Sequence, residues 1–130
     1  MNVLICGDRD WWEMMPIVRV IDLLPEGTIV VHGAARGADR IAGKIASAGG
    51  FAILSFPADW ARYHKGAGPI RNQQMLDEGK PDLVIYFHHD LEDSKGTKNM
   101  VTIARKAGIS VLDGVKDIEA IKVFLEKIAI

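Results

Sequence analysis

Short apolar runs that recur along the chain constrain its fold more than any other feature. Five runs rich in Val, Ile and Leu stand at Asn2–Cys6, Thr28–His32, Phe51–Phe56, Asp82–Phe87 and Ile109–Leu112. Each run is continuous and does not alternate with polar residues, which is typical of strands buried on both faces of a parallel sheet. Because segments with helical patterning separate the runs, the sequence predicts an α/β fold: a three-layer, doubly wound sheet of about five mostly parallel strands.

The helical segments are recognised by apolar stripes and by proline or glycine near their ends. We expect a turn through Trp11–Met14 and helices at about Met15–Leu24, Ala38–Ala48, Pro69–Glu78, Lys98–Ala107 and Asp117–Ile130. Proline is favoured at the first position of a helix, and glycine just after its end. This places the start of the third helix at Pro69 and its end before Gly79. The segments Pro57–Gly68 and His88–Thr97 are expected to be irregular.

Composition narrows the class of protein. A chain of 130 residues with 48% hydrophobic and 25% charged residues predicts one folded domain, residues 1–130, and excludes a disordered chain. The net charge of -1 argues against a general nucleic-acid binder. The single cysteine, Cys6, favours a reducing compartment, and no apolar run approaches the roughly 20 residues of a membrane span. We therefore expect a cytoplasmic protein with no membrane contact.

Unusual residues follow the predicted strands, where the loops of a doubly wound sheet form the ligand crevice. In the loop after the second strand, Gly33 and Gly37 let a backbone come close to a ligand, and the helix start that follows offers free N–H groups to an anion. The glycine spacing matches neither the dinucleotide fingerprint nor a phosphate-binding loop of the Gly-Lys-Ser type. Tight packing of strand against helix explains the same two glycines equally well.

A cation near a helix start gives a second indication of an anionic ligand. If the helix begins at Pro69, Arg71 lies in its first turn, where the helix dipole disfavours a cation by roughly 0.3–1 kcal/mol. Lys98 repeats this pattern at the next helix start. Pairing of Arg71 with Asp59 or Asp77 is the alternative. The repetition favours a ligand that carries phosphate.

Five motifs together resemble a known family. They are Gly7–Trp11, His32–Asp39, Pro57–Trp60, Gly68–Asn72 and Lys95–Thr97. In this order they resemble the YspA-type, cpYpsA-related branch of the SLOG superfamily, whose Rossmann-like domains include Smf/DprA and the LONELY GUY phosphoribohydrolases. The resemblance runs from Val3 to about Val111 and implies a Rossmann-like fold with a nucleotide or nucleotide-derived ligand. In the hydrolase relatives, a nucleoside 5′-monophosphate is cleaved to the free base and ribose 5-phosphate.

The resemblance also implies individual roles. Gly33, Arg36 and Gly37 would line the phosphate and ribose side, and Arg71 would correspond to the substrate-binding arginine of the hydrolases. Gly96 and Thr97 would bind phosphate. With their neighbours, the predicted ligand-binding residues are Gly7, Arg9, Gly33, Arg36, Gly37, Arg71, Asn72, Lys95, Gly96 and Thr97.

The chain departs from the hydrolase pattern at the residue that would assist cleavage. The hydrolases carry an acidic residue two or three places after Gly-Thr, where this chain has Asn99 and Met100. Cleavage of an N-glycosidic bond develops oxocarbenium character, which a carboxylate stabilises and an amide does not. Asp8 and Asp39 are the candidate catalytic replacements, each with an ordinary alternative as a helix-start acid or as the partner of a neighbouring arginine. The acidic residues before Gly96 are interpreted as a solvated charge run: Asp90, Glu92 and Asp93.

Other residues that could carry chemistry have simpler explanations. His88 and His89 are adjacent and leave a strand in different directions, so we predict no metal site, and no cofactor is expected. His32 is interpreted as a hydrogen-bonded core residue and Cys6 as inert packing. The tryptophans flank the proposed crevice; one is a candidate to stack on a base, and core or subunit packing is expected of the others: Trp11, Trp12 and Trp60.

Two functional hypotheses follow. In the first, the chain binds a nucleotide and hydrolyses its N-glycosidic bond as a nucleoside 5′-monophosphate phosphoribohydrolase. In the second, it is a non-catalytic sensor or sequestering protein for an NAD-derived or other nucleotide signal, which the amide of Asn99 favours. Binding of single-stranded DNA is a weaker third reading, against which the near-zero net charge counts. We also expect a homodimer, with Trp11 or Trp12 supplying apolar surface.

Overall fold

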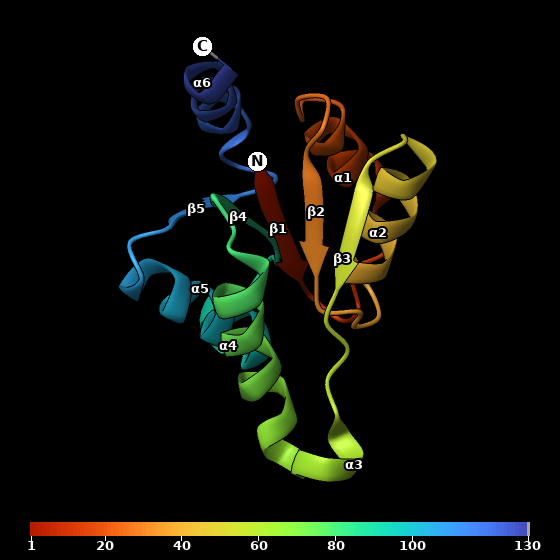
Figure 1. Cartoon of the computed structure of the whole chain (residues 1–130), viewed down its shortest axis with the longest axis vertical. Helices are drawn as coiled ribbons and strands as arrows, with labels where there is room; N and C mark the ends of the chain where they lie inside the picture. Colours follow the sequence, from red (N-terminus) through yellow and green to blue (C-terminus); the bar gives the residue numbers. More distant parts are fainter. Residues whose placement is uncertain (130) are drawn as a thin grey trace.

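The computed structural model describes residues 1–129 and contains one parallel sheet (Figure 1). Its five strands are β1 (Asn2–Gly7), β2 (Ile29–His32), β3 (Ala52–Ser55), β4 (Leu83–Phe87) and β5 (Ser110–Asp113). They lie in the order β3-β2-β1-β4-β5, and every neighbouring pair is parallel. The predicted α/β fold with a doubly wound parallel sheet is confirmed. From β1, the strands β2 and β3 follow on one side of the sheet and β4 and β5 on the other, so the strand order reverses between β1 and β4.

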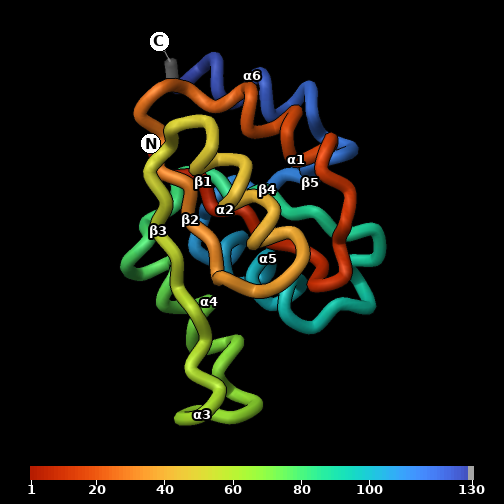
Figure 2. Tube along the Cα trace, turned by 90° about the vertical axis from the view of Figure 1, so that its right-hand side faces the viewer, coloured from red at the N-terminus to blue at the C-terminus, as the bar shows by residue number. Residues whose placement is uncertain are grey.

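Helices cover both faces of this sheet. They are α1 (Met14–Ile21), α2 (Ala38–Ala48), α3 (Trp60–Tyr63), α4 (Ala67–Gly79), α5 (Gly96–Lys106) and α6 (Ile118–Ala129), with short 3-10 turns at η1 (His64–Gly66) and η2 (Leu91–Asp93). Helices α1, α2 and α6 pack on one face and α4 and α5 on the other, while α3 projects at the far end from α6 (Figure 2). The predicted end of the last helix at Ile130 lies outside the described residues.

The apolar core consists of two clusters separated by the sheet. Successive side chains of a strand point to opposite faces. Ile5 of β1 therefore packs with Ile17 and Ile121 under α1 and α6, whereas Leu4 packs with Met75 under α4. Cys6 belongs to the second cluster, so its interpretation as buried packing is confirmed. Burial on both faces explains the continuous apolar runs of β1, β2 and β4. The edge strands β3 and β5 are mostly exposed or half-buried, so the expected burial on both faces is wrong for them.

The start of α4 differs from the prediction. The helix begins at Ala67, so Pro69 is its third residue, and the preceding segment, expected to be irregular, contains α3 and η1. Proline is tolerated there because the N–H groups of a first helical turn have no intrahelical partner. Asp59 caps α3 by accepting the N–H of Arg62 at 3.1 Å. Arg71 consequently lies in the second turn of α4, and the argument that placed a cation in the first turn is wrong.

Two other helices also begin earlier than expected. Helix α1 includes Met14 and Pro16 in its first turn and ends at Ile21, short of the expected Leu24. Helix α5 begins at Gly96, so Lys98 is its third residue, and its Nζ pairs with a carboxylate oxygen of Glu92 at 3.2 Å. Lys98 therefore lies in the first turn of its helix as expected, but unlike Arg71 it is paired with a carboxylate. None of the helices described within residues 1–129 is long and apolar enough to cross a membrane.

Candidate functional site

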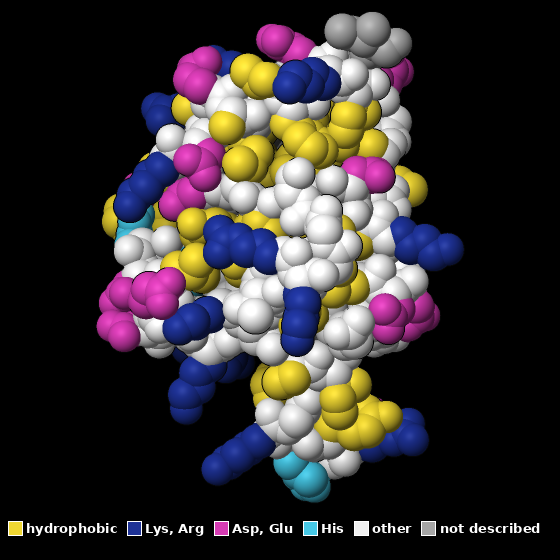
Figure 3. Space-filling view, turned by 90° about the vertical axis from the view of Figure 1, so that its left-hand side faces the viewer, with side chains coloured by type: hydrophobic (Ala, Val, Ile, Leu, Met, Phe, Trp, Pro, Cys, Tyr) yellow, Lys and Arg dark blue, Asp and Glu magenta, His cyan; other side chains and the backbone are white. Residues whose placement is uncertain are grey.

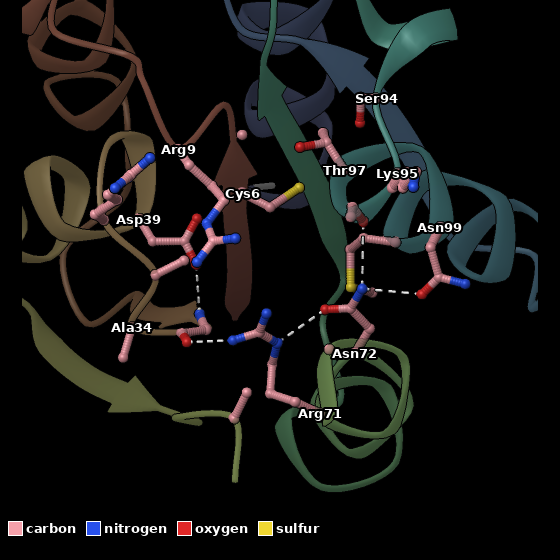
Figure 4. A pocket seen from close by; sticks show the side chains of 18 of the residues that line it. Cys6, Arg9, Ala34, Asp39, Arg71, Asn72, Ser94, Lys95, Thr97 and Asn99 are labelled. Atoms are coloured by element: carbon pink, nitrogen blue, oxygen red, sulfur yellow. Dashed lines mark hydrogen bonds between the residues drawn. The ribbon is translucent and has the colours of Figure 1, made fainter. Parts of the chain in front are cut away.

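A cleft of about 990 Å³ opens at the carboxyl ends of the strands, beside the point where the strand order reverses (Figure 4). The loops that follow β1, β2, β3 and β4 all line it. This is where ligands bind in open α/β sheets. The structure brings together nine of the ten predicted ligand-binding residues in this cleft: Gly7, Arg9, Gly33, Arg36, Arg71, Asn72, Lys95, Gly96 and Thr97.

Gly37 is the predicted residue that does not line the cleft. Its φ of +79° lies in the region that favours glycine, and a Cβ atom there would collide with the carbonyl oxygen of Asp8. Next to it, Ala38 donates its N–H to the same carbonyl at 3.1 Å. Gly37 therefore lets the loop after β1 pack against the start of α2, which corrects its expected contact with a ligand. A Cβ at Gly7 would likewise collide with the backbone of Phe87, although Gly7 also lines the cleft.

Arg71 points its guanidinium into the cleft from α4 (Figure 4). Its Nη1 donates to the carbonyl of Gly33 and lies 3.5 Å from that of Phe56, and its Nε donates to Oδ1 of Asn72 at 3.0 Å. Within residues 1–129 no carboxylate oxygen lies within 4.0 Å of the guanidinium, so the expected alternative pairing with Asp59 or Asp77 is wrong. Nη2 makes no hydrogen bond to the described residues. Arg71 therefore presents a free donor to the cleft and forms no ion pair with the described residues.

Asp39 binds the N–H of Gly33, whereas Arg71 binds the carbonyl of the same residue. The side chain is buried, with 4% of its surface exposed, and its Oδ2 accepts the N–H of Gly33 at 2.8 Å. Burial raises the pKa of Asp39 to about 6, although hydrogen bonds from backbone N–H groups and the charge of Arg71 act in the other direction. The alternative pairing of Asp39 with Arg36 is wrong, because Arg36 pairs with the exposed Asp10 at 3.3 Å.

Gly33 is thus held by both of its polar backbone groups. Asp39 binds the N–H, and Arg71 binds the carbonyl. A Cβ on Gly33 would lie 2.6 Å from Nη1 of Arg71, so only glycine leaves room for the guanidinium. We call this arrangement of Gly33, Asp39 and Arg71 the Gly33 clamp. Burial lowers the pKa of Arg71, whereas the charge of Asp39 raises it.

A second network connects α4 to the start of α5. The buried Asn72 donates from Nδ2 to Oδ1 of Asn99 at 2.9 Å and to the carbonyl of Gly96 at 3.3 Å (Figure 4). Asn99 stands where the hydrolase pattern has an acidic residue. Its side-chain oxygen therefore serves to position Asn72, which in turn accepts the N–H of Arg71 Nε. The sequence marked Asn99 as a departure but gave no sign of this partner.

The first turn of α5 offers unused hydrogen-bond donors to the cleft. Gly96 and Thr97 line the cleft, and their backbone N–H groups donate no hydrogen bond to the described part of the chain. Lys95 precedes them, and a Cβ at Gly96 would meet no atom within 4 Å. Free N–H groups at a helix start and a nearby ammonium group form a favourable environment for an anion.

Asp8 has no arginine partner. Its Oδ1 accepts the N–H of Asp10 at 2.9 Å, and its Oδ2 lies 4.0 Å from Nε2 of His88. The side chain is 32% exposed and lines the cleft. Because its nearest charged partner among residues 1–129 is His88, the expected alternative pairing with Arg9 is wrong. Arg9 lies instead over the ring of Trp60, with 5.9 Å from Cζ to the ring centroid.

The cleft is more positive than the chain as a whole. Six cationic side chains line it, against three carboxylates: Arg9, Arg36, Arg40, Lys65, Arg71 and Lys95, against Asp8, Asp10 and Asp39. The whole chain carries a formal charge of -1. Sequence reasoning missed Arg40 and Lys65, because only the folded positions of α2 and η1 bring them to the same cleft. This concentration of positive charge favours an anionic ligand.

The histidines and cysteine have structural partners. His32 is buried, accepts the N–H of Ala34 at Nδ1, and burial lowers its pKa, so its interpretation as a hydrogen-bonded core residue is confirmed. His88 accepts the N–H of Asp90, and His89 contacts Glu13 at 3.2 Å. Among residues 1–129, no three His, Cys, Asp or Glu side chains are grouped so that they could hold a metal ion. Burial also raises the pKa of the Cys6 thiol.

The three tryptophans occupy different environments. Trp11 is 5% exposed, packs on Phe87 and donates from Nε1 to the carbonyl of Glu13 at 2.7 Å. It therefore belongs to the core and supplies no subunit surface. Trp12 is 80% exposed and lies outside the cleft, whereas Trp60 is 48% exposed and lines it.

Comparisons with known proteins agree with the motifs. Residues 1–63 match the YspA, cpYpsA-related SLOG family. The chain is 38% identical over 121 residues to the Gene 61 protein of Mycobacterium phage D29, which covers 86% of this chain and 94% of that protein. The fold of the present chain is similar to that of DNA processing protein A (DprA) from Streptococcus pneumoniae, with a TM-score of 0.71 and 16% identity over 97% of this chain. The chain spans 56% of the length of that solved chain. The resemblance seen in the sequence is confirmed, and the chain belongs to the YspA, cpYpsA-related SLOG family.

Proposed function

We propose that the cleft binds a nucleotide or nucleotide-derived ligand through its phosphate. One observation carries the proposal: Arg71, with no carboxylate partner among residues 1–129, lines the same cleft as the unused N–H groups of Gly96 and Thr97. An arginine fork and a helix start are both common phosphate-binding groups. Membership of the SLOG family supports a nucleotide as the molecule that carries the phosphate.

The surroundings of Asn99 and Asp39 favour a protein that binds a nucleotide over one that hydrolyses it. Asn99 is hydrogen bonded to Asn72 and has no carboxylate to stabilise an oxocarbenium ion. Asp39 is buried and binds the N–H of Gly33. We therefore favour a sensor or sequestering protein for an NAD-derived or other nucleotide signal.

Hydrolysis of a nucleoside 5′-monophosphate is the second candidate, and one feature supports it. The carboxylate of Asp8 is partly exposed in the cleft and has no arginine or lysine within 4.0 Å among the described residues. In this reaction water adds to C1′ of the ribose, the bond to the base breaks, and the base leaves with a proton.

Mass spectrometry distinguishes the two candidates. The purified protein is mixed with nucleoside 5′-monophosphates, deoxynucleotides and NAD-derived nucleotides, and ultrafiltration separates bound from free compounds. A nucleotide retained intact supports the sensor, and a free base that appears together with ribose 5-phosphate supports the hydrolase. Retention of none of these compounds, with no products, contradicts both.

Arg71→Ala tests the phosphate contact. A hydrogen bond to a charged group contributes roughly 1.5–3 kcal/mol, so the variant should lose most of the retained nucleotide and keep the circular dichroism spectrum of the wild type. Arg19→Ala removes an exposed arginine of α1 outside the cleft and serves as the matched control. Equal retention by the Arg71→Ala variant and the wild type would remove Arg71 from the binding site.

A further inference from the structure

The ring of Trp60 is exposed in the cleft, and the fold does not account for that position. Nearly half of its surface is in water, although large aromatic side chains contribute more to stability when they are buried. We propose that Trp60 stacks on the nucleobase of the bound ligand, an inference that rests on the proposed nucleotide binding. It assigns the residue that recognises the flat aromatic part of the ligand.

The local structure holds Trp60 at the mouth of the cleft. Trp60 is the first residue of α3, which projects beyond the carboxyl ends of the strands (Figure 1). The carboxylate of Asp59 caps this short helix. A Cβ at Gly68 would lie 3.5 Å from Cη2 of Trp60, which places the edge of the indole against the first turn of α4. The position of the ring is therefore defined before any ligand binds.

Nearly half of the Trp60 surface stays exposed although Arg9 lies over one face of the ring. The guanidinium carbon of Arg9 lies 5.9 Å from the ring centroid, within cation–π range, whereas carbon atoms in contact are about 3.5–4.0 Å apart. Both indole rings and guanidinium planes stack on nucleobases. A base that enters at this point would contact Trp60 directly and have Arg9 beside it.

The arrangement of the cleft suits a ligand with a base at one end and a phosphate at the other. Figure 4 shows Arg9 on the opposite side of the cleft from Lys95 and Thr97, which stand at the start of α5. Trp60 lies on the same side of the cleft as Arg9, whose guanidinium is over the indole ring. A phosphate at the start of α5 would therefore leave the base directed toward the indole ring.

The surface around Trp60 is mixed in character. The projection formed by residues 60–70 exposes hydrophobic, basic and histidine side chains (Figure 3). Tyr63 and Ile70 are partly exposed there, and Arg62 lies over the ring of Tyr63 at 5.0 Å. Of the aromatic residues in this projection, Trp60 lines the cleft and Tyr63 does not. Stacking in the cleft is therefore assigned to Trp60.

Calorimetric titration of Trp60→Ala and Trp60→Phe tests the proposal. The probes are the four ribonucleoside 5′-monophosphates and ribose 5-phosphate, which lacks a base. Stacking of a base on an aromatic side chain predicts that Trp60→Ala weakens nucleotide binding roughly 5- to 150-fold, while Trp60→Phe retains most of it. Binding of ribose 5-phosphate should change less than about twofold in either variant, because it makes no stacking contact.

Trp12→Ala is the matched control, because Trp12 is exposed and lies outside the cleft. Its nucleotide affinity should equal that of the wild type. Unchanged nucleotide affinity in Trp60→Ala, or an equal loss for ribose 5-phosphate, would overturn the stacking role while leaving nucleotide binding intact. Failure of the wild type to bind any of the five probes or any NAD-derived nucleotide would instead overturn the proposed function, and the stacking role with it.

Discussion

Asp39 should make the protein less stable as the pH rises, and Asp39→Asn should remove that effect. The carboxylate is buried and faces the N–H of Gly33. Asparagine has nearly the same shape and keeps an oxygen that can accept this N–H, but it cannot ionise. The substitution therefore isolates the cost of the buried negative charge.

The size and sign follow from the pKa. In the unfolded chain Asp39 has the ordinary pKa of 3.8, and in the folded protein burial raises it to about 6. Between these values the folded state binds more protons, so the free energy of unfolding falls as the pH rises and the loss is complete above about pH 7. Each pKa unit corresponds to about 1.36 kcal/mol, so the total loss is about 3 kcal/mol. Stability contributed by the protonated carboxyl is thus fully present below about pH 3.8.

Urea denaturation between pH 4 and pH 7.5 measures this effect. The difference in unfolding free energy between Asp39→Asn and the wild type should increase across this range in favour of the variant by about 2.5 kcal/mol, because part of the total loss has already occurred at pH 4. Other titrating groups contribute equally to both proteins and cancel in the difference. Asp10→Asn removes a charge from an exposed carboxylate and serves as the control. A difference between Asp39→Asn and the wild type that stays constant with pH would refute the reasoning.

Two further substitutions test the geometry of the site. In Gly33→Ala the new Cβ would lie 2.6 Å from Nη1 of Arg71, so the end of this flexible side chain must move; we expect the loss of nucleotide retention and, from the lost hydrogen bond to the Gly33 carbonyl, a loss of about 0.5–1.5 kcal/mol in urea denaturation. Gly66→Ala, whose Cβ would meet no atom nearer than 3.9 Å, is the control, and full retention by Gly33→Ala would contradict the expected displacement. In Asn72→Ala, partners at Asn99 and Arg71 lose part-buried hydrogen bonds at the edge of the cleft, which should cost about 0.5–1.5 kcal/mol. Thermal unfolding at an unchanged midpoint would show that the network contributes nothing to stability.

The sheet could be predicted because its signal is local. Each strand, including the less buried edge strands β3 and β5, lies in a continuous apolar run, so all five were located to within one or two residues. The starts of the helices were harder to predict, because proline fits several positions of a first helical turn. Pro69 therefore did not mark the start of α4, and the reasoning that followed from it about Arg71 was wrong although Arg71 does line the cleft.

Contacts within the site could not be predicted, because they join residues far apart in the chain. Arg71 binds the carbonyl of Gly33, and nothing near either residue in the sequence indicates the other. The sequence grouped Gly37 with Gly33 as a predicted ligand-binding glycine; its positive φ and its position behind Asp8 show that it serves packing. A glycine in a loop thus identifies a close approach, but not the group that approaches.

The three residues of the Gly33 clamp, Gly33, Asp39 and Arg71, depend on one another. The missing side chain at Gly33 leaves the space that the Arg71 guanidinium occupies, and the N–H of Gly33 is turned toward the buried carboxylate of Asp39. The charge of Asp39 in turn favours the charged form of Arg71, which burial alone would disfavour. Substitutions within one such network are generally not additive. Gly33→Ala and Arg71→Ala both remove the guanidinium from its position, so the double variant should lose little more nucleotide binding than either single variant.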